Sequence, residues 1–482
     1  MIARALLAVS LLLMSLADPS PAQVTTATFY GIVVDPSGSV VVGAEASLVN
    51  EGTKASLRQQ TSNTGEFAFN FVPVGVYTLR IQANGFKTAV NSGLQLSAGE
   101  NLRRTFTLDL GTVAESVEVS TQTSVVNTVS AEQRETVGTR QVVELPLSRR
   151  NVANIVTLTS GVTRSSGDIY LNGAGRGGTS ISVDGTDATG NPERPSLAMF
   201  GDYNYINGIS IEAVGEVQIT KGVIPAEYTR SMGGNLNIVS RSGTNQLHGS
   251  LFENFRAENL NARNQLLATK PGVTFNQFGG SLGGPILKDR IFAFGVYEGY
   301  RERAFQPVQG NVPSARLRDA MLRSVPDYKL WLDTVPLPNQ PLATPDAPTG
   351  AFVGAGSLKN EDNHFLIKPD VRITDWASAS VTWTRFRPTR EEPRVQPVNS
   401  RQFTGVTDRW TASTTLFGTH WTSESRYGYN KNVVDRLDAI FNIEDPNKKE
   451  SKFGARRIPG INALGFSGVH RTCFLFYSDP QC

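Results

Sequence analysis

The glycines of residues 173–178 form the one spacing in this chain that could bind a cofactor. Gly173, Gly175 and Gly178 match a dinucleotide-binding loop, which needs a strand before the glycines, a helix after them and an acidic residue about 20 positions further on. The β-branched segment 179–183 predicts a strand where the helix should be. We therefore interpret the glycines as a tight turn and predict no cofactor.

Histidine and nucleophile motifs are the next candidates for chemistry. His248, His364, His420 and His470 are far apart in the sequence, so their spacing predicts neither a metal site nor a histidine-dependent triad. The sequence contains neither the phosphate-binding motif G-x-x-x-x-G-K-[ST] nor the nucleophile motif G-x-S-x-G. We predict that the protein is not an enzyme.

The chain has two cysteines, Cys473 and Cys482, close together near the C-terminus. In an exported protein they could form a disulfide across a short loop, or they could remain free thiols. The pair is a candidate disulfide, and both alternatives stay open.

The N-terminal residues predict a signal peptide over residues 1–22. Arg4 supplies a positive charge, residues 5–17 form an apolar run, and residues 20–22 are the small residues expected before a cleavage site, with Gln23 next. An apolar run of about 13 residues is shorter than the ~20 that a helix needs to span a bilayer. No later stretch of 18 apolar residues occurs. Any membrane insertion would therefore use a β-barrel.

Composition limits the fold class and the partners. A chain of 482 residues exceeds what one compact core usually holds, so we expect several domains. The net charge is +3 without a long lysine or arginine run, which argues against nucleic acid as a partner. Glycine and aromatic residues are abundant, which favours a mainly β fold.

Residues 24–110 predict a small β-sandwich of immunoglobulin-like architecture. Six β-branched or aromatic segments at short spacing predict its strands, namely 28–34, 46–50, 56–61, 66–71, 77–81 and 102–108. We expect Phe67, Phe69 and Phe71 to share one face of the fourth strand. Exposed aromatic rings could stack on sugars, but these three are more simply explained as core residues.

The glycine and aromatic positions of this region resemble the carboxypeptidase-regulatory-like domain, a module with the fold of starch-binding domains. The matching positions are Gly31, Val33, Asp35, Gly38, Val41, Gly43, Ala44, Thr64, Gly65, Phe67, Pro73, Gly75, Tyr77 and Leu79. The family name refers to the regulatory sandwich of metallo-carboxypeptidases. The zinc-ligand spacing of a peptidase is absent from this sequence.

Residues 126–240 predict a compact α/β globule. We expect a helical hairpin within 142–158 and strands at 179–183, 211–219 and 233–239. The pair Asp184-Gly185 predicts a turn after the first of these strands.

Residues 243–482 predict amphipathic strands. The clearest runs through 377–384, with Ala377, Ala379, Val381 and Trp383 on one face. Such alternation is typical of outer-membrane barrel strands, although soluble sandwiches show it too. Residues 306–360 are rich in proline and small residues and predict a long loop.

Residues 126–301 resemble TonB-dependent outer-membrane receptors, with a plug domain followed by the first barrel strands of the Oar-like subgroup. The plug-like segments are 145–151, 160–162, 183–185, 214–217, 226–228 and 233–239, and the barrel-like segments are 242–250, 276–286 and 292–301. The resemblance implies a protein of the cell outer membrane, surrounded by its lipid, that imports a large scarce solute. It also implies a TonB-type energy-coupling protein of the inner membrane as partner. Siderophore, oligosaccharide and peptide remain open as the solute.

The resemblance also places a TonB box, the segment that the energy-coupling protein grips, in the linker 111–125. Its candidate residues are Val113, Glu115, Ser116, Val117, Glu118 and Val119. The alternation of this segment predicts a strand without a hairpin partner. Such a strand could pair with another chain by edge addition, or it could join a neighbouring sheet of the same protein.

The expected architecture is therefore mainly β: a sandwich, an α/β plug domain and a partial transmembrane antiparallel β-barrel over 243–482. A plugged barrel of this type needs about 22 strands, and the region after residue 243 holds about six to eight. We expect a truncated receptor that cannot close its barrel unaided. The alternative function is a cell-surface carbohydrate-binding or adhesion protein.

Overall fold

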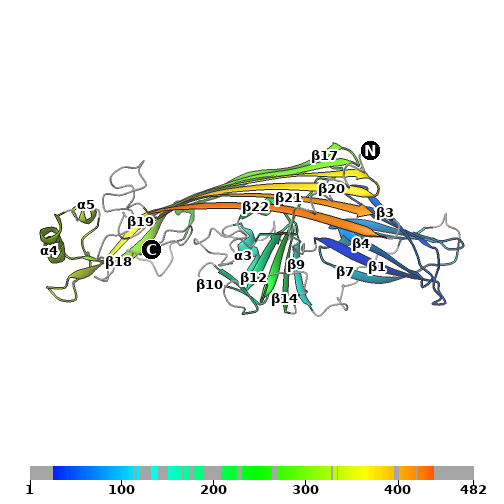
Figure 1. Ribbon diagram of the computed structural model, residues 1–482, viewed down its shortest axis with the longest axis horizontal. Helices are drawn as coiled ribbons and strands as arrows, with labels where there is room; N and C mark the ends of the chain where they lie inside the picture. Colours follow the sequence, from blue (N-terminus) through cyan, green and yellow to red (C-terminus); the bar gives the residue numbers. More distant parts are fainter. Residues whose placement is uncertain are drawn as a thin grey trace, which may run out of the picture.

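The computed structural model describes residues 25–111, 116–118, 132–138, 150–165, 168–173, 178–188, 208–222, 224, 231–262, 270, 272–326, 329–333, 335–393, 395, 401–418 and 421–438. The expected signal peptide and the candidate disulfide Cys473–Cys482 lie outside these residues. The described chain is mainly β and forms three bodies, a sandwich, a plug and a long curved sheet that we call the wall (Figure 1).

The sandwich contains two sheets. The first has the order β4-β1-β7, with β1 Thr26–Val34, β4 Glu66–Pro73 and β7 Asn101–Thr107, and the second has the order β3-β2-β5-β6-β8, with β2 Glu45–Asn50, β3 Ser56–Gln60, β5 Gly75–Gln82, β6 Thr88–Leu96 and β8 Ser116–Glu118. All six predicted strands are present. The core between the sheets includes Phe29, Leu48, Phe67 and Leu79, each nearly inaccessible to solvent.

The expectation for Phe71 was wrong. Phe67 and Phe69 are buried on one face of β4, but Val72 takes the next buried position in place of Phe71. Phe71 has a φ of 54°, and the pairing of β1 with β4 shifts register at this point. A β-bulge therefore inserts one extra residue and turns the side chains that follow.

The plug is a five-stranded sheet of order β13-β12-β15-β14-β9. Its strands are β9 Glu132–Gly138, β12 Thr179–Val183, β13 Thr186–Asp187, β14 Val214–Gly222 and β15 Gly234–Ser240. A short helix, α3 Val152–Val156, lies on one face, and a hairpin of β10 Val162–Ser165 and β11 Asp168–Leu171 lies beside it. Of the expected helical hairpin, α3 is the described part. Residues 211–213 were expected to be strand but form the 3-10 turn η2 Ile211–Ala213, capped by the Ser210 hydroxyl.

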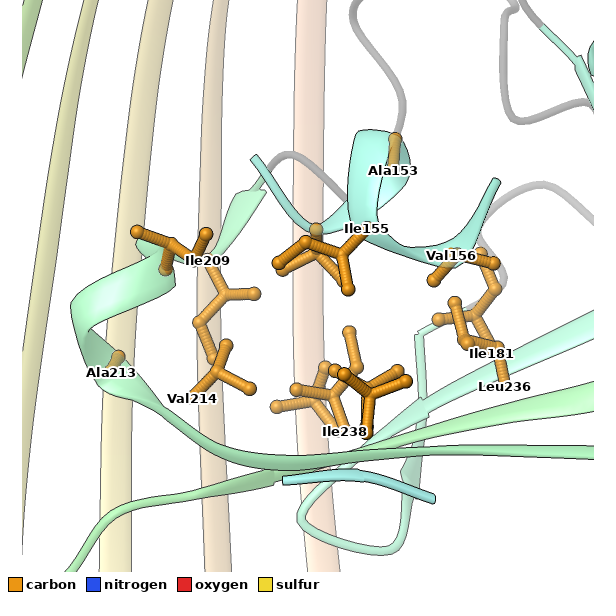
Figure 2. Close-up of a cluster of buried hydrophobic side chains, with 14 of the residues drawn as sticks. Ala153, Ile155, Val156, Ile181, Ile209, Ala213, Val214, Leu236 and Ile238 are labelled. Carbon is orange, nitrogen blue, oxygen red and sulfur yellow. The ribbon is translucent and has the colours of Figure 1, made fainter. Parts of the chain in front are cut away.

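The two faces of the plug sheet differ sharply in chemistry. One face carries Ile181, Leu236 and Ile238, which pack against Ile155 and Val156 of α3 (Figure 2). The alternating positions on the other face are polar, and Ser180, Ser182, Asn235, Asn237, Gln218 and Thr220 are all buried there. Buried polar groups are stable only when they are hydrogen-bonded. The Ser182 hydroxyl donates to Asn237 at 2.8 Å, and the Asn237 amide donates to Gln218 at 3.3 Å.

The wall is an antiparallel meander in which each strand pairs with the next. Its strands are β16 His248–Ala257, β17 Val273–Leu287, β18 Ile291–Pro313, β19 Thr349–Thr374, β20 Ala377–Glu392, β21 Arg401–Phe417 and β22 Thr422–Asp438. Within the described residues, β16 and β22 are the two edges of an open sheet. The wall arches over the plug, and the sandwich lies at one end of it (Figure 1).

The expectation of a long loop over 306–360 was wrong in its extent. β18 and β19 pair without interruption from Ile291↔Val371 to Pro313↔Thr349, and the connection between them carries α4 Ala315–Ser324 and α5 Lys329–Leu332. The outer part of this hairpin is rich in small and polar residues, and its buried apolar side chains, which include Val308 and Val312, are too far apart in the sequence to show an alternating pattern. At about 3.4 Å per residue, the 23 residues of β18 extend far beyond an apolar membrane band of about 25 Å.

The two ends of the wall have different connections. Short connections, at 288–290, 375–376 and 418–421, join the strands at one end, whereas the connections at the other end, at 258–272, 314–348 and 393–400, are longer. Outer-membrane barrels have short turns on the periplasmic side and long loops outside. The short-turn end, where the sandwich lies, is therefore the expected periplasmic end.

Candidate functional site

The contact between the plug and the inner face of the wall is the candidate functional site. Glu212 of η2 is almost completely buried at this contact. Its carboxylate lies 3.6 Å from Arg150 Nη2 and 4.0 Å from Arg241 Nη1. The Ser250 hydroxyl of β16 donates to the same carboxylate at 2.7 Å. One buried acidic group thus connects three segments of the plug region to the first wall strand.

A second group of polar contacts lies beside the first. The Ser210 hydroxyl of the plug donates to Glu298 of β18. Gln277 Nε2 of β17 donates to Glu298 Oε1 at 2.6 Å and to the backbone carbonyl of Arg150 at 2.9 Å. Glu298 and Gln277 are both buried, so two neighbouring wall strands present polar side chains inward to the plug.

A third group lies at the turn after β12, which the sequence predicted at Asp184-Gly185. Asp184 has a φ of 49° and Gly185 a φ of 73°, as that tight turn requires. The Asp184 carboxylate accepts from the Ser240 backbone N–H at 2.8 Å and from its hydroxyl at 2.7 Å. Lys368 Nζ of β19 donates to the Ser240 carbonyl at 3.2 Å. Lys368 therefore points inward from the wall and binds the end of β15 through this hydrogen bond.

Apolar contact between plug and wall is smaller in extent. Phe294, Val296 and Leu366 point inward from β18 and β19 and join the plug core. Most of the other described plug-to-wall links are hydrogen bonds or ion pairs. A hydrogen bond between neutral groups contributes only about 0.5–1.5 kcal/mol net, and one to a charged group about 1.5–3 kcal/mol, because water replaces part of what is lost. Displacement of the plug from the wall would break these polar contacts and would also expose the side chains of Phe294, Val296 and Leu366.

The outer face of the wall is apolar, whereas its inner face is largely polar. Val381, Trp410 and Tyr429 point outward, and Trp410 keeps 47% of its surface exposed. Their neighbours Thr382, Thr384 and Thr411 are buried on the inner face. The sequence predicted this apolar-out, polar-in alternation, and the structure confirms it.

Aromatic side chains form two rows on the outer face. Trp376 and Trp421 lie at the short-turn end, and Trp383 and Trp410 lie further along the strands, with ring centroids 5.8 Å apart. Trp383 is seven positions after Trp376, a length of about 23 Å along a strand. Two aromatic girdles around an apolar band are typical of outer-membrane barrels.

The sandwich contacts the plug through the turn between β6 and β7. The Ala98 backbone N–H donates to Glu216 Oε1 of β14 at 2.7 Å, and Gln218 Nε2 donates to the Ala98 carbonyl. The Arg134 guanidinium of β9 donates to the Gly99 carbonyl. Burial raises the pKa of the Glu216 carboxyl, and the negative charge of Glu100 adds to this, although the Ala98 N–H and the Arg134 charge lower it.

The candidate TonB box lies partly within the described residues. Ser116, Val117 and Glu118 form β8, which pairs in parallel with Thr88, Ala89 and Val90 of β6. This is the arrangement in which the strand joins a sheet of its own chain, and β8 is the outermost strand of that sheet. The candidate residues Val113, Glu115 and Val119 lie outside the described residues.

The glycine motif at 173–178, which we interpret as a turn, lies partly within the described residues. Asn172 and Gly173 form a left-handed turn after β11, with φ values of 48° and 71°. Gly178 directly precedes β12, so the glycines lead into a strand, as the sequence predicted. A nucleotide-binding helix does not follow them.

Neither a metal cluster nor a membrane-spanning helix is found in the part of the chain that the structure describes. There, no three histidine, cysteine, aspartate or glutamate residues come together in a way that could hold a metal ion. None of the helices within the described ranges is long and apolar enough to cross a bilayer.

Comparisons with known proteins assign two of the three bodies. Residues 28–109 match a carboxypeptidase regulatory-like domain, and residues 239–329 match an outer membrane beta barrel domain. Over 299 residues the chain is 28% identical to the TonB-dependent transporter Oar of Myxococcus xanthus. This match covers 57% of the chain and 27% of Oar, so the chain spans about a quarter of the length of that curated relative.

Two solved structures are similar over part of the chain. The outer membrane transporter YddB from Escherichia coli has a TM-score of 0.43 at 13% identity, covering 62% of this chain and 38% of YddB. The alcaligin outer membrane receptor FauA from Bordetella pertussis has a TM-score of 0.36 at 13% identity, covering 65% of this chain and 49% of FauA. The sequence matches, and not these partial likenesses, indicate that the chain is a homologue of an outer-membrane transporter and lies in the outer membrane.

Proposed function

We propose that this chain acts in an energy-coupled outer-membrane receptor that imports a large, scarce solute, and that a TonB-type protein of the inner membrane drives the import. The solute class stays at siderophore, oligosaccharide or peptide. The matched part of Oar, a TonB-dependent transporter, supports this reading.

The observation that carries the proposal is the contact of a separate globule with the polar inner face of a membrane-type sheet. The wall presents apolar and aromatic residues outward, while Glu298, Gln277 and Lys368 face the plug. A sheet with this polarity suits a barrel strand array in lipid. A globule with a sheet of its own, separate from the sheet of the wall, suits a removable stopper on the inner side.

The position of β8 supports an energy-coupled mechanism. A TonB-type protein that adds a strand to this segment would use backbone hydrogen bonds, which need an accessible strand edge. β8 is an edge strand, and it lies between the sandwich and the plug in the sequence. A pull on the segment 113–119 would therefore act on the chain just before the plug.

The alternative function, a carbohydrate-binding sandwich, is not supported by the core aromatic residues. Phe67, Phe69 and Tyr77 are buried in the sandwich core, where they cannot stack on a sugar.

The experiment that tests the proposal is a binding assay with the periplasmic domain of the energy-coupling protein. The full chain in outer-membrane vesicles carries Val117→Pro, which removes a backbone N–H and restricts the strand. We expect that most of the periplasmic domain no longer co-sediments with vesicles that carry this variant. Val125→Pro, the same change later in the same linker, is the matched control and should bind like the unmodified chain. Equal binding by the Val117→Pro chain would overturn the proposed motor contact.

A further inference from the structure

One end of the sandwich is docked on the short-turn end of the wall. Arg426 Nη2 of β22 donates to Thr25 Oγ1 at 2.6 Å, and Arg372 Nη1 of β19 donates to the Lys54 carbonyl at 3.3 Å. The Asn245 backbone N–H donates to the Gly52 carbonyl at 2.9 Å. The start of β1 and the β2–β3 turn thus meet two strands of the wall and the segment just before β16.

The same end of the sandwich covers the polar face of the plug sheet. Ala98 is fully buried, and its N–H and carbonyl are both bonded to β14 side chains. Through Gln218 the contact continues into the buried ladder of Asn237 and Ser182. The β6–β7 turn therefore completes a hydrogen-bond network that would otherwise need water.

A partly open cavity remains between the three bodies. A cavity of about 270 Å³ is lined by residues from all of them, including Tyr77 of the sandwich, Asp184 of the plug and Ser413 of the wall. This cavity lies at the periplasmic end defined by the short turns. A solute that passed a displaced plug here would meet the sandwich next.

We propose that the sandwich is a second stopper, which covers the periplasmic face of the plug and must undock before a solute can pass. The passage of a solute in this inference rests on the proposed function. The docking of the sandwich does not depend on that function. The docking contacts of the described residues include these hydrogen bonds, which water can replace when the sandwich undocks. Because β8 belongs to the sandwich, a pull on the motor segment would act on this stopper before it acts on the plug.

A disulfide trap tests the docking. A Cβ built on Gly52 would lie 3.5 Å from Thr244 Cβ, which is within the Cβ–Cβ range of a disulfide. The chain carrying Gly52→Cys and Thr244→Cys, with Cys473→Ser and Cys482→Ser, is oxidised mildly in outer-membrane vesicles. We expect most molecules to be cross-linked, as measured by mass spectrometry of the joined peptides.

The matched control replaces Gly52→Cys by Gly38→Cys. Gly38 lies in the turn after β1, at the other end of the sandwich, and its added Cβ would meet nothing within 4 Å. We expect no link from this position to residue 244. Absence of the 52–244 link, or equal linking by both pairs, overturns the docking and leaves the motor-binding test of the proposed function unaffected.

Hydrogen exchange tests the covering role. With the 52–244 disulfide closed, we expect β14 amides to exchange at least about threefold more slowly than in the reduced protein, because undocking then no longer exposes them. Wall amides of β17 and β18 serve as the folding control and should not change. A closed link with unchanged β14 exchange would show a docked sandwich that is not a stopper.

Discussion

Removal of the Glu212 carboxylate is expected to weaken the attachment of the plug to the wall. Glu212→Ala leaves the guanidinium groups of Arg150 and Arg241 without their shared counter-charge, and their side chains are only 14% and 19% exposed. It also removes one of the two hydrogen-bond partners of the Ser250 hydroxyl, the other being the Ser281 hydroxyl. Breaking a fully buried ion pair costs about 3–5 kcal/mol. The separations of 3.6 and 4.0 Å and the residual exposure lower this to about 2–4 kcal/mol.

Hydrogen exchange of the plug strands β14 and β15 measures this cost as a local opening free energy. A loss of 2–4 kcal/mol corresponds to about 30- to 1000-fold faster exchange, since 1.36 kcal/mol is a factor of ten. Glu253→Ala is the control, because Glu253 is an exposed residue on the outward-facing side of β16, and we expect a change below about 0.5 kcal/mol there. If Glu212→Ala changed exchange by less than about twofold, the reasoning about the buried cluster would be refuted.

Three further results are expected. Ile238→Ala, in the fully buried plug core, should lower the opening free energy of the plug by about 2–5 kcal/mol, seen as faster exchange of β12 and β15. Gly234→Ala should cost about 1–3 kcal/mol in the same measurement, because the added Cβ would lie 2.4 Å from Leu171 Cδ1. The pKa of Glu216 is raised from 4.5 in the docked state, so its contribution to docking is present below that ordinary value and is lost as pH rises through the raised pKa. Protection of the Ala98 amide, corrected for intrinsic exchange, should accordingly fall as pH rises above the ordinary value of 4.5, and Glu216→Gln should remove that dependence; the same pH profile in this variant would contradict it.

Local patterns were enough to predict most strands. The alternation of Phe67 and Phe69 placed β4, and the opposed faces of residues 377–384 placed β20, because a side-chain period of two follows from strand geometry alone. The turn at Asp184-Gly185 was predictable because it needs positive φ values that aspartate and glycine tolerate.

Elements without such periodicity were missed. β6 carries Thr88 and Asn91 at buried positions and Gly93 at a φ of 71°, so its sequence does not alternate. β9 is a polar strand that completes the plug sheet only by pairing with β14. The outer parts of β18 and β19 are stabilised by each other, so composition alone suggested a loop.

Contacts between residues that are far apart in the chain could also not be predicted from the sequence patterns. The candidate site depends on Glu212, Glu298 and Lys368 meeting plug partners that are distant in the chain. None of these residues stood out by type or spacing. A charged residue on the inner face of a strand beside apolar neighbours, such as Lys368 next to Ile367, was the available signal.

The central claim, that the wall lies in lipid with the plug against its inner face, is tested most directly by brominated-lipid quenching of single tryptophans. Trp410 points outward, whereas Ser413, on the same strand, lines the inner cavity. The chain is reconstituted either with Trp410 alone or with Ser413→Trp alone, the remaining tryptophans being replaced by phenylalanine. We predict strong quenching at position 410 and little at position 413. Equal quenching at the two positions, or none at either, would contradict the account.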